Sequence, residues 1–259
     1  RWYTARMVKK SFHAARISTD SEPALELLRS SPDTLVVAMN HQSWWDPLVG
    51  LLLASEICPD RPGLAPMDRE MLERFAILRR VGIFGLDPDD PASLEAMCDY
   101  FASFASNNPG GALWLTPQGE FADPRAPIRL RPGAAAVAAG HDDCRVVSVA
   151  VEYAFWLDKK PEFFLHTSEV STPEQRSVAG WHRALTRAMR SDNERLAQLV
   201  TARSPDAFTP LVDSNAGGTS PIYNLWLRLR GKQNDLASER TTRPNAEDTA
   251  RIEGDGRPA

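Results

Sequence analysis

Residues 35–57 read LVVAMNHQSWWDPLVGLLLASEI, and they decide how we expect this chain to fold. The first five residues form an apolar run that is typical of a parallel strand buried on both faces. Residues 47–57 have the pattern of a helix, and Pro47 suits its first turn. His41 and Asp46 therefore lie in one strand-to-helix connection, where α/β proteins commonly place their chemistry.

The histidine and the aspartate of this connection suit acid–base catalysis. Histidine is the usual general base in enzymes, and a nearby carboxylate orients its ring and stabilises the imidazolium. The sequence thus predicts His41 as the catalytic base and Asp46 as its partner. An alternative is that Asp46 caps the helix and that His41 is an ordinary polar residue at the end of a strand.

The string NHQSWWDPL resembles the first motif of the glycerolipid acyltransferase family, which includes the bacterial lysophosphatidate acyltransferases. Arg131, in the string RPGA, stands at the distance that the family would have after its third motif. The resemblance covers residues 30–170 and implies acyl transfer with His41 and Asp46 as the catalytic pair. Three further blocks resemble the other motifs in family order: VGIFGLD at 81–87, LTPQGE at 115–120 and VVSVAV at 146–151.

The resemblance implies transfer of a fatty acyl group from acyl-CoA or acyl-carrier protein to a hydroxyl group. Such a reaction needs a base for the alcohol and donors for the oxyanion. The chain has no nucleophile elbow of the form G-x-S-x-G, so direct attack of the acceptor on the thioester is the simpler mechanism. We expect no cofactor beyond the acyl donor, and no metal, because no second ligand stands at a suitable spacing from His41.

Several residues near the motifs are candidates for contact with substrates. Trp44 and Trp45 shape an apolar acyl site beside the base, or they pack the start of the helix onto the core. The residues 116–119 follow a strand and read as a tight turn, in which the backbone amides of Gly119 and Glu120 face the pocket and donate to an anion or oxyanion. The alternative is an ordinary strand-to-helix turn. The full predicted substrate-binding set is Trp44, Trp45, Gln118, Gly119, Glu120, Phe121 and Arg131.

The chain departs from the family where the family holds its glycerol phosphate. Asp68, Pro88, Gln118 and Phe121 stand in place of a lysine, an arginine, a glutamate and an arginine, and Glu120 replaces a threonine. Because phosphate recognition relies on cationic and preferably forked donors, we expect a lipid-like acceptor alcohol without a phosphate. One alternative is a catalytically silent protein of the same fold that binds lipid or a partner. Another is a lysophospholipid acyltransferase with relocated arginines, chosen from Arg79, Arg80, Arg125, Arg129 and Arg131.

The alternation of strand and helix patterns predicts a single α/β domain, with a mostly parallel sheet flanked by helices, over residues 31–203. Before it we expect a basic amphipathic segment at 1–30, whose residues 1–17 read as a helix. After it we expect a loop with an aromatic and basic peripheral segment at 204–232, then a polar, disordered tail at 233–259. The expected strands are 35–39, 82–86, 112–116, 146–151 and 162–167, and the expected helices are 47–57, 69–80, 91–106, 132–139 and 174–203.

Charge and hydropathy narrow the choice of partners. A net charge of −4 gives no reason to expect nucleic-acid binding. The basic and apolar residues of 1–17 suit a helix that lies on an anionic membrane surface. The alternative is a helix that docks its apolar side on the domain. No apolar run reaches the ~20 residues that span a bilayer, and no signal peptide is recognisable, so we expect a cytoplasmic protein that associates peripherally with the membrane. Cys58, Cys98 and Cys144 lack metal-ligand spacing and suit small buried thiols in a reducing compartment.

Overall fold

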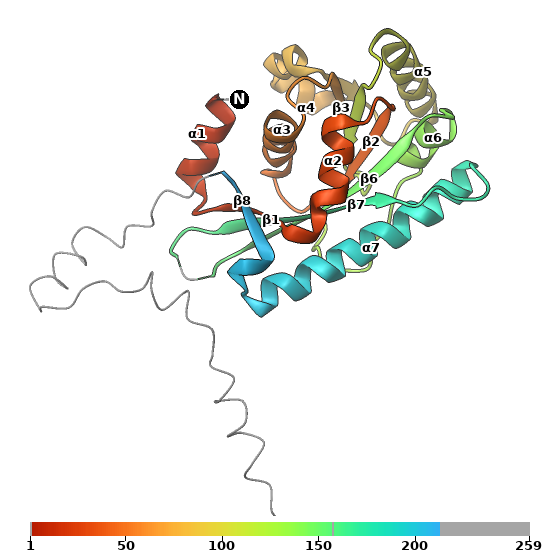
Figure 1. Ribbon diagram of the computed structural model, residues 1–259. Helices are drawn as coiled ribbons and strands as arrows, with labels where there is room; N and C mark the ends of the chain where they lie inside the picture. Colours follow the sequence, from red (N-terminus) through yellow and green to blue (C-terminus); the bar gives the residue numbers. More distant parts are fainter. Residues whose placement is uncertain (1, 157, 213–259) are drawn as a thin grey trace, which may run out of the picture. The chain divides into compact units, whose positions relative to one another are not determined.

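The computed structural model describes residues 2–156 and 158–212, and these residues form one α/β domain (Figure 1). Its α-helices are α1 (Trp2–Ser11), α2 (Glu22–Ser30), α3 (Asp46–Ile57), α4 (Arg69–Arg74), α5 (Pro91–Asn107), α6 (Gly133–Ala139) and α7 (Val178–Ala202). Its strands are β1 (Ala15–Ser18), β2 (Leu35–Met39), β3 (Gly63–Asp68), β4 (Ile83–Leu86), β5 (Ala112–Leu115), β6 (Arg145–Ala154), β7 (Glu162–Val170) and β8 (Phe208–Val212). Short 3-10 helices are η1 (Thr19–Ser21), η2 (Ala76–Val81) and η3 (Pro205–Ala207).

The strands form one sheet in the order β4-β3-β5-β2-β6-β7-β1-β8. The first five of these strands run parallel to one another. β7 is antiparallel to β6, β1 is parallel to β7, and β8 is antiparallel to β1. The prediction of an α/β domain with a mostly parallel sheet flanked by helices is therefore confirmed.

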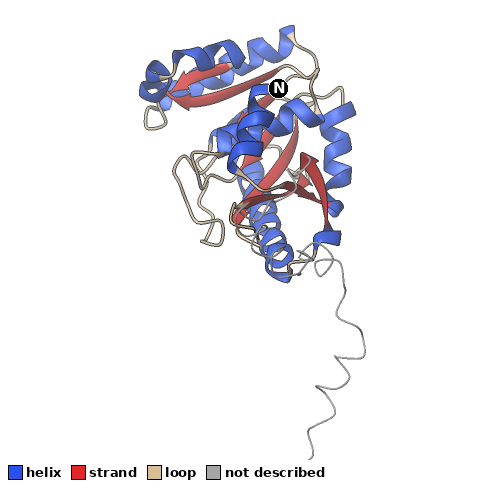
Figure 2. Cartoon of the chain, turned by 90° about the vertical axis from the view of Figure 1, so that its left-hand side faces the viewer, coloured by secondary structure: helices blue, strands red, loops and turns tan. Residues whose placement is uncertain are grey.

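Helices cover both faces of this sheet (Figure 2), which explains why β2 is apolar at every position. Leu35, Val37 and Met39 pack into a core cluster with α2 and α3, to which Val8 of α1 also belongs. Val36 and Ala38 point to the opposite face, where α5, α6 and α7 supply the neighbouring side chains. Burial on both faces is what the continuous apolar run predicted.

The N-terminal segment differs from the helix predicted over residues 1–17. α1 ends at Ser11, and Ala15–Ser18 form β1 between β7 and β8. The reason is a local period of two, because Ala15 and Ile17 are buried while Arg16 between them pairs with Glu162.

The apolar side chains at the end of α1 dock on the domain. Val8 and Phe12 are buried in the same core cluster as β1 and β2, which is the second of the two arrangements considered for this helix. Its predicted amphipathic character stays a prediction, because the side chains of residues 1–5 lie outside the described part.

Besides β1, one α-helix and two strands have no counterpart in the expected set: α2, β3 and β8. β3 contains Pro66, which normally argues against an inner strand, but only Gly63 and Leu64 pair with β5, so the proline lies beyond that ladder. β8 falls inside the predicted loop at 204–232, and the expected helix 69–80 is divided into α4 and η2. The predicted aromatic and basic segment after residue 212 and the tail at 233–259 lie outside the described residues.

The parallel strands bring five chain segments to one edge of the sheet. β2, β3, β4, β5 and β6 all end there, so the connections that follow them meet in space. The motif at 40–46 follows β2 and the turn at 116–119 follows β5, its neighbour. Within the described ranges, no helix combines the length and the apolarity needed to cross a membrane.

Candidate active site

His41 and Asp46 are hydrogen-bonded in the loop between β2 and α3. The Nδ1–H of His41 donates to Asp46 Oδ2 over 2.8 Å. Asp46 is fully buried, whereas the imidazole retains about a fifth of its side-chain exposure. With Nδ1 bound to the carboxylate, Nε2 is the nitrogen left to accept a proton from a substrate.

The carboxylate of Asp46 also holds the loop that precedes it. Its Oδ2 accepts hydrogen bonds from the backbone amides of Gln42 (2.7 Å) and Ser43 (2.8 Å). Both residues precede α3, whose N-cap position is Trp45. Asp46 is therefore not a conventional helix cap, because its carboxylate binds the loop that carries His41 rather than the first turn of the helix.

Tyr153, which was not predicted to be a site residue, binds the other oxygen of this carboxylate. Tyr153 is the last residue but one of β6, and its hydroxyl donates to Asp46 Oδ1 over 2.7 Å. Burial, together with the negative charge of Asp46 and the hydrogen bond to it, raises the pKa of Tyr153 far above its usual value. The hydroxyl therefore stays protonated and remains a donor. The expected strand ended at residue 151, so Tyr153 was left out of the region that reaches the site.

Two amide side chains fix the backbone on either side of His41. Asn40 bridges β2 to β6 through Val151, donating to its carbonyl (3.0 Å) and accepting from its amide (2.7 Å). Gln118 accepts from the backbone N–H of His41 over 2.8 Å. Since the carbonyl of His41 in turn accepts from Ala122 (2.8 Å), the segment after β5 holds the main chain of the histidine from both sides.

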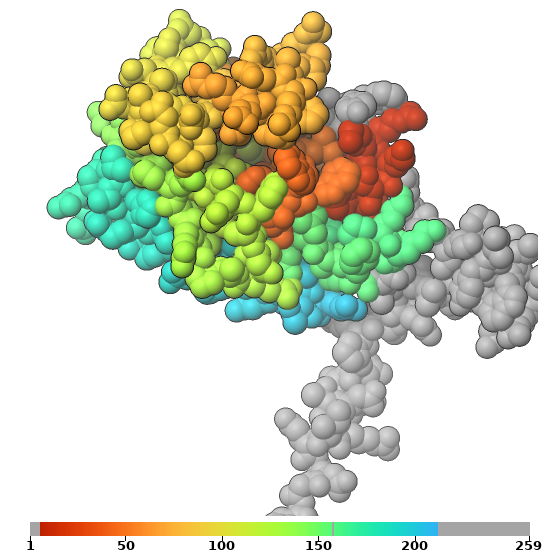
Figure 3. All heavy atoms as spheres, turned by 180° about the vertical axis from the view of Figure 1, so that it is seen from behind, coloured from red at the N-terminus to blue at the C-terminus, as the bar shows by residue number. Residues whose placement is uncertain are grey.

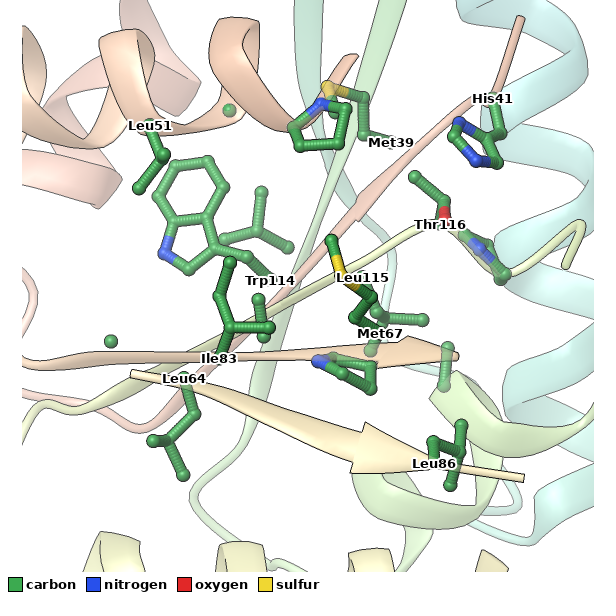
Figure 4. Close-up of a pocket in the computed structure, with 18 of the residues that line it drawn as sticks. Met39, His41, Leu51, Leu64, Met67, Ile83, Leu86, Trp114, Leu115 and Thr116 are labelled. Atoms are coloured by element: carbon green, nitrogen blue, oxygen red, sulfur yellow. The ribbon is translucent and has the colours of Figure 1, made fainter. Parts of the chain in front are cut away.

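A cavity of about 770 Å³ opens beside the pair, within the range typical of small-molecule sites. Figure 4 shows His41 and Thr116 on one side of this cavity and Leu51 and Trp114 on the other. Its wall is predominantly apolar and comes from α3, β3, β4 and β5. Such a space suits an elongated apolar group whose reacting end lies at His41.

The structure brings most of the predicted substrate-binding set to this cavity. Trp44, Gly119, Glu120, Phe121 and Arg131 line it together with His41.

The other two members of that set lie elsewhere. Gln118 is buried, bonded to the main chain of His41, and does not line the cavity. Trp45 packs against Phe12 with ring centroids 5.0 Å apart, so it belongs to the packing under α1. For Trp45 the structure thus favours the alternative, in which the residue packs the start of the helix onto the core.

Two aromatic side chains form the rim of the cavity beside the base. The ring centroid of Phe121 lies 4.4 Å from that of His41 and 5.3 Å from that of Trp44. Trp44 is 70% exposed and Phe121 is 46% exposed, which is unusual for side chains of this size. An exposed aromatic pair beside His41 offers an apolar surface to a bound molecule rather than to the core.

Both cations in the cavity wall are already bound by the protein itself. Among the described residues, Arg61 and Arg131 are the only arginine or lysine side chains that line it. Arg61 donates to the backbone carbonyls of Leu28, Ser31, Asp33 and Gly110.

The second of these cations, Arg131, is held through Nη1 alone, and its side chain stays 44% exposed. Nη1 donates to the carbonyl of Pro88 (2.6 Å) and to Asp89 Oδ1 (2.8 Å). The acidic residues Asp68 and Glu120 line the cavity too. Among the described residues, the wall therefore presents no arginine or lysine that lacks a protein partner.

The remaining arginines considered for phosphate binding lie outside the cavity wall. Arg125 forms an ion pair with Glu152. Arg79 and Arg80 are exposed on η2, and Arg129 is exposed as well. None of the three lines the cavity.

The turn after β5 adopts a conformation that requires glycine. Gly119 has a φ of +71°, and a Cβ placed on it would lie 2.6 Å from Nε of Arg131. Its amide donates to the carbonyl of Thr116 (3.1 Å), so that amide is used within the turn. The backbone amide of Glu120 has no hydrogen-bond partner among the described residues and borders the cavity. Of the two amides proposed as anion donors, Glu120 is therefore the one left available.

The chain matches a known family over the region that contains this site. Residues 24–152 match the family model described as Acyltransferase. The matched region begins in α2 and ends in β6, so it includes His41 and Asp46, the turn after β5 and the strands that position them. No curated protein matches the chain. The protein is an acyltransferase, and its residues 24–152 are the part that matches the Acyltransferase family.

Proposed function

We propose that this enzyme moves a fatty acyl group from acyl-CoA or acyl-carrier protein to the hydroxyl group of a lipid-like acceptor that carries no phosphate. One observation carries the proposal: the His41–Asp46 pair opens on an apolar cavity whose arginines are both engaged by the protein's own oxygen atoms. The apolar wall suits an acyl chain, and the engaged arginines leave no cradle for a phosphomonoester.

The pair performs general-base catalysis in this proposal. Nε2 of His41 takes the proton from the acceptor hydroxyl as its oxygen attacks the thioester carbon. Asp46 stabilises the imidazolium that forms, and the amide of Glu120 donates to the oxyanion. When the tetrahedral intermediate collapses, the carbon–sulfur bond breaks and the departing thiolate takes the proton back from His41. The sulfur leaves as a free thiol, and the ester remains on the acceptor.

The nature of the acceptor follows from the rim. Phe121 and Trp44 offer an apolar surface next to Nε2 that suits a lipid tail or the face of a sugar. Asp68 and Glu120 carry negative charge at the same opening and oppose a phosphate dianion. Attraction and repulsion thus both favour an uncharged alcohol.

The first test removes the base. His41→Ala is expected to lower thiol release from acyl-CoA in the presence of acceptor by roughly 10²-fold or more, which is the usual size of a general-base contribution. The variant should stay folded, although its free energy of unfolding should fall by about 1.5–3 kcal/mol, because the buried carboxylate of Asp46 loses one of its hydrogen bonds. His141→Ala, which removes a histidine outside the cavity, is the matched control and should keep full activity. A folded His41→Ala variant with normal turnover would refute the assignment.

The second test concerns the acceptor. Lysophosphatidate and unphosphorylated lipid alcohols are compared at matched concentration, and the alcohols are expected to react faster. A preference for lysophosphatidate of roughly tenfold, about 1.4 kcal/mol in transition-state binding, would show instead that relocated arginines hold a phosphate. Phe121→Arg places one cation at the rim and should shift the preference toward lysophosphatidate.

A further inference from the structure

Five of the eight large apolar side chains that are exposed in the described ranges lie in the cavity wall or in the segment 69–81. Trp44, Val81 and Phe121 are exposed members of the cavity wall. Phe75 and Ile77 are 50% and 62% exposed on the segment 69–81, which comprises α4, Phe75 and η2. This segment approaches the cavity at both ends, because Met71 and Val81 line it. Single exposed apolar residues are ordinary, but a group of them beside an apolar cavity marks an interaction site.

The same segment carries unpaired positive charge. Residues 69–81 contain four arginines and two glutamates, a net charge of +2 in a chain whose net charge is −4. Arg74, Arg79 and Arg80 are exposed and form no ion pair within the described ranges. We call the exposed side chains Arg74, Phe75, Ile77, Arg79 and Arg80 the α4–η2 surface. Figure 3 shows residues 69–81, in orange to gold, at the top of the molecule as seen from behind.

We propose that the α4–η2 surface docks on an anionic lipid surface and delivers lipid chains to the cavity. Apolar side chains interleaved with arginines suit the boundary between anionic headgroups and acyl chains. The apolar surface continues through Val81 and Met71 into the cavity wall, so a chain can pass from the lipid into the site without crossing water. This inference rests on the proposed function for the role of the cavity, whereas the docking itself is independent of it.

The experiment measures binding of the full chain to vesicles of phosphatidylcholine, with and without phosphatidylglycerol. Two double variants probe the surface: Phe75→Ser with Ile77→Ser, and Arg79→Glu with Arg80→Glu. Each double variant is expected to weaken partitioning onto the anionic vesicles by at least about tenfold. The reason is that each basic residue near such a surface, and each apolar side chain buried in it, contributes to the free energy of binding. None of these four residues lines the cavity, so activity on detergent-dispersed substrates should stay unchanged.

Matched controls repeat the same chemical changes elsewhere. Phe155→Ser removes an equally exposed phenylalanine at the end of β6, and Arg183→Glu with Arg187→Glu reverses two exposed charges on α7. Both controls should bind vesicles like the wild type. Wild-type affinity in the α4–η2 variants, or no preference of the wild type for anionic vesicles, would overturn the proposal. A dimer in sedimentation equilibrium that the variants dissociate would reassign this surface to self-association.

The outcome is separable from that of the proposed reaction. Should no acceptor be acylated while vesicle binding depends on the α4–η2 surface, the docking stands and the proposed function fails. Should transfer to dispersed acceptors proceed while the variants bind vesicles normally, the reaction stands and the docking proposal fails.

Discussion

Replacing Tyr153 by phenylalanine tests whether the buried carboxylate must be held from both sides. The substitution keeps the ring, which packs against Phe12 and Phe163, and removes the hydroxyl that lies 2.7 Å from Asp46 Oδ1. Oδ2 keeps its three hydrogen bonds from the loop, but Oδ1 loses the one that Tyr153 provides. Because Asp46 is fully buried, bulk water does not replace the lost donor.

The magnitude follows from the charge of the acceptor. A hydrogen bond to a charged group contributes about 1.5–3 kcal/mol, so the free energy of unfolding should fall by about that amount. For a domain of this size each kcal/mol corresponds to roughly 2–4 °C in Tm. Since about 1.4 kcal/mol is a factor of ten in rate, a carboxylate that no longer fixes the imidazole should lower kcat/KM by roughly tenfold or more.

The split between kcat and KM separates a positioning role from a purely structural one. A carboxylate that no longer fixes the imidazole should lower kcat, whereas KM should stay close to that of the wild type because Tyr153 does not line the cavity. Tyr100→Phe, on the exposed part of α5, is the matched control and should change neither quantity.

The decisive comparison is a double-mutant cycle with Asp46→Asn. If Tyr153 acts through Asp46, its replacement should cost much less in the Asp46→Asn background than in the wild type. Full kcat in a destabilised Tyr153→Phe protein would refute the positioning role and leave only a structural one.

Two further predictions concern the turn and the thiols. Gly119→Ala should lower the free energy of unfolding by about 1–3 kcal/mol in urea, because its φ is +71° and the new Cβ meets Arg131. Gly140→Ala should change it by no more than about 0.5 kcal/mol, because φ is −83° there and the new Cβ would make only ordinary van der Waals contacts at 3.6 Å. Burial raises the pKa of Cys58 to about 11 and that of Cys144 to about 12, so neither thiol of the native protein should be alkylated by iodoacetamide at pH 8. Rapid labelling of Cys58, which borders the cavity, would show that this part of the wall opens to solvent.

The centre of the fold was predictable because its signals are local and strong. β2 was expected at 35–39 and has those bounds, and the helix expected at 47–57 begins one residue earlier. Both elements are long or fully apolar, and the pair between them lies five residues apart. The outer strands were missed for the opposite reason. β1 and β8 are short, and their pairing partners are far away in sequence, so only tertiary contacts define them.

Only those residues of the site that lie in one continuous chain segment were predictable from the sequence. His41 and Asp46 share a loop, and their hydrogen bond follows from that loop's conformation. Tyr153 reaches the same carboxylate from β6, more than a hundred residues later, through the pairing of β2 with β6. The register between β2 and β6 determines this contact. Because the expected strand ended at residue 151, Tyr153 was not predicted to reach the site.

Arg131 shows why residue type alone does not reveal what binds a substrate. The resemblance suggested a substrate contact, since Arg131 stands where the family places an arginine after its third motif. In the structure its guanidinium donates to the carbonyl of Pro88 and to Asp89. Pro88 is itself the residue that replaces an expected arginine of the second motif. The negative charge of Asp89 attracts the guanidinium to the loop after β4. These two segments are more than forty residues apart in sequence, so only the folded structure reveals that the protein itself binds Arg131.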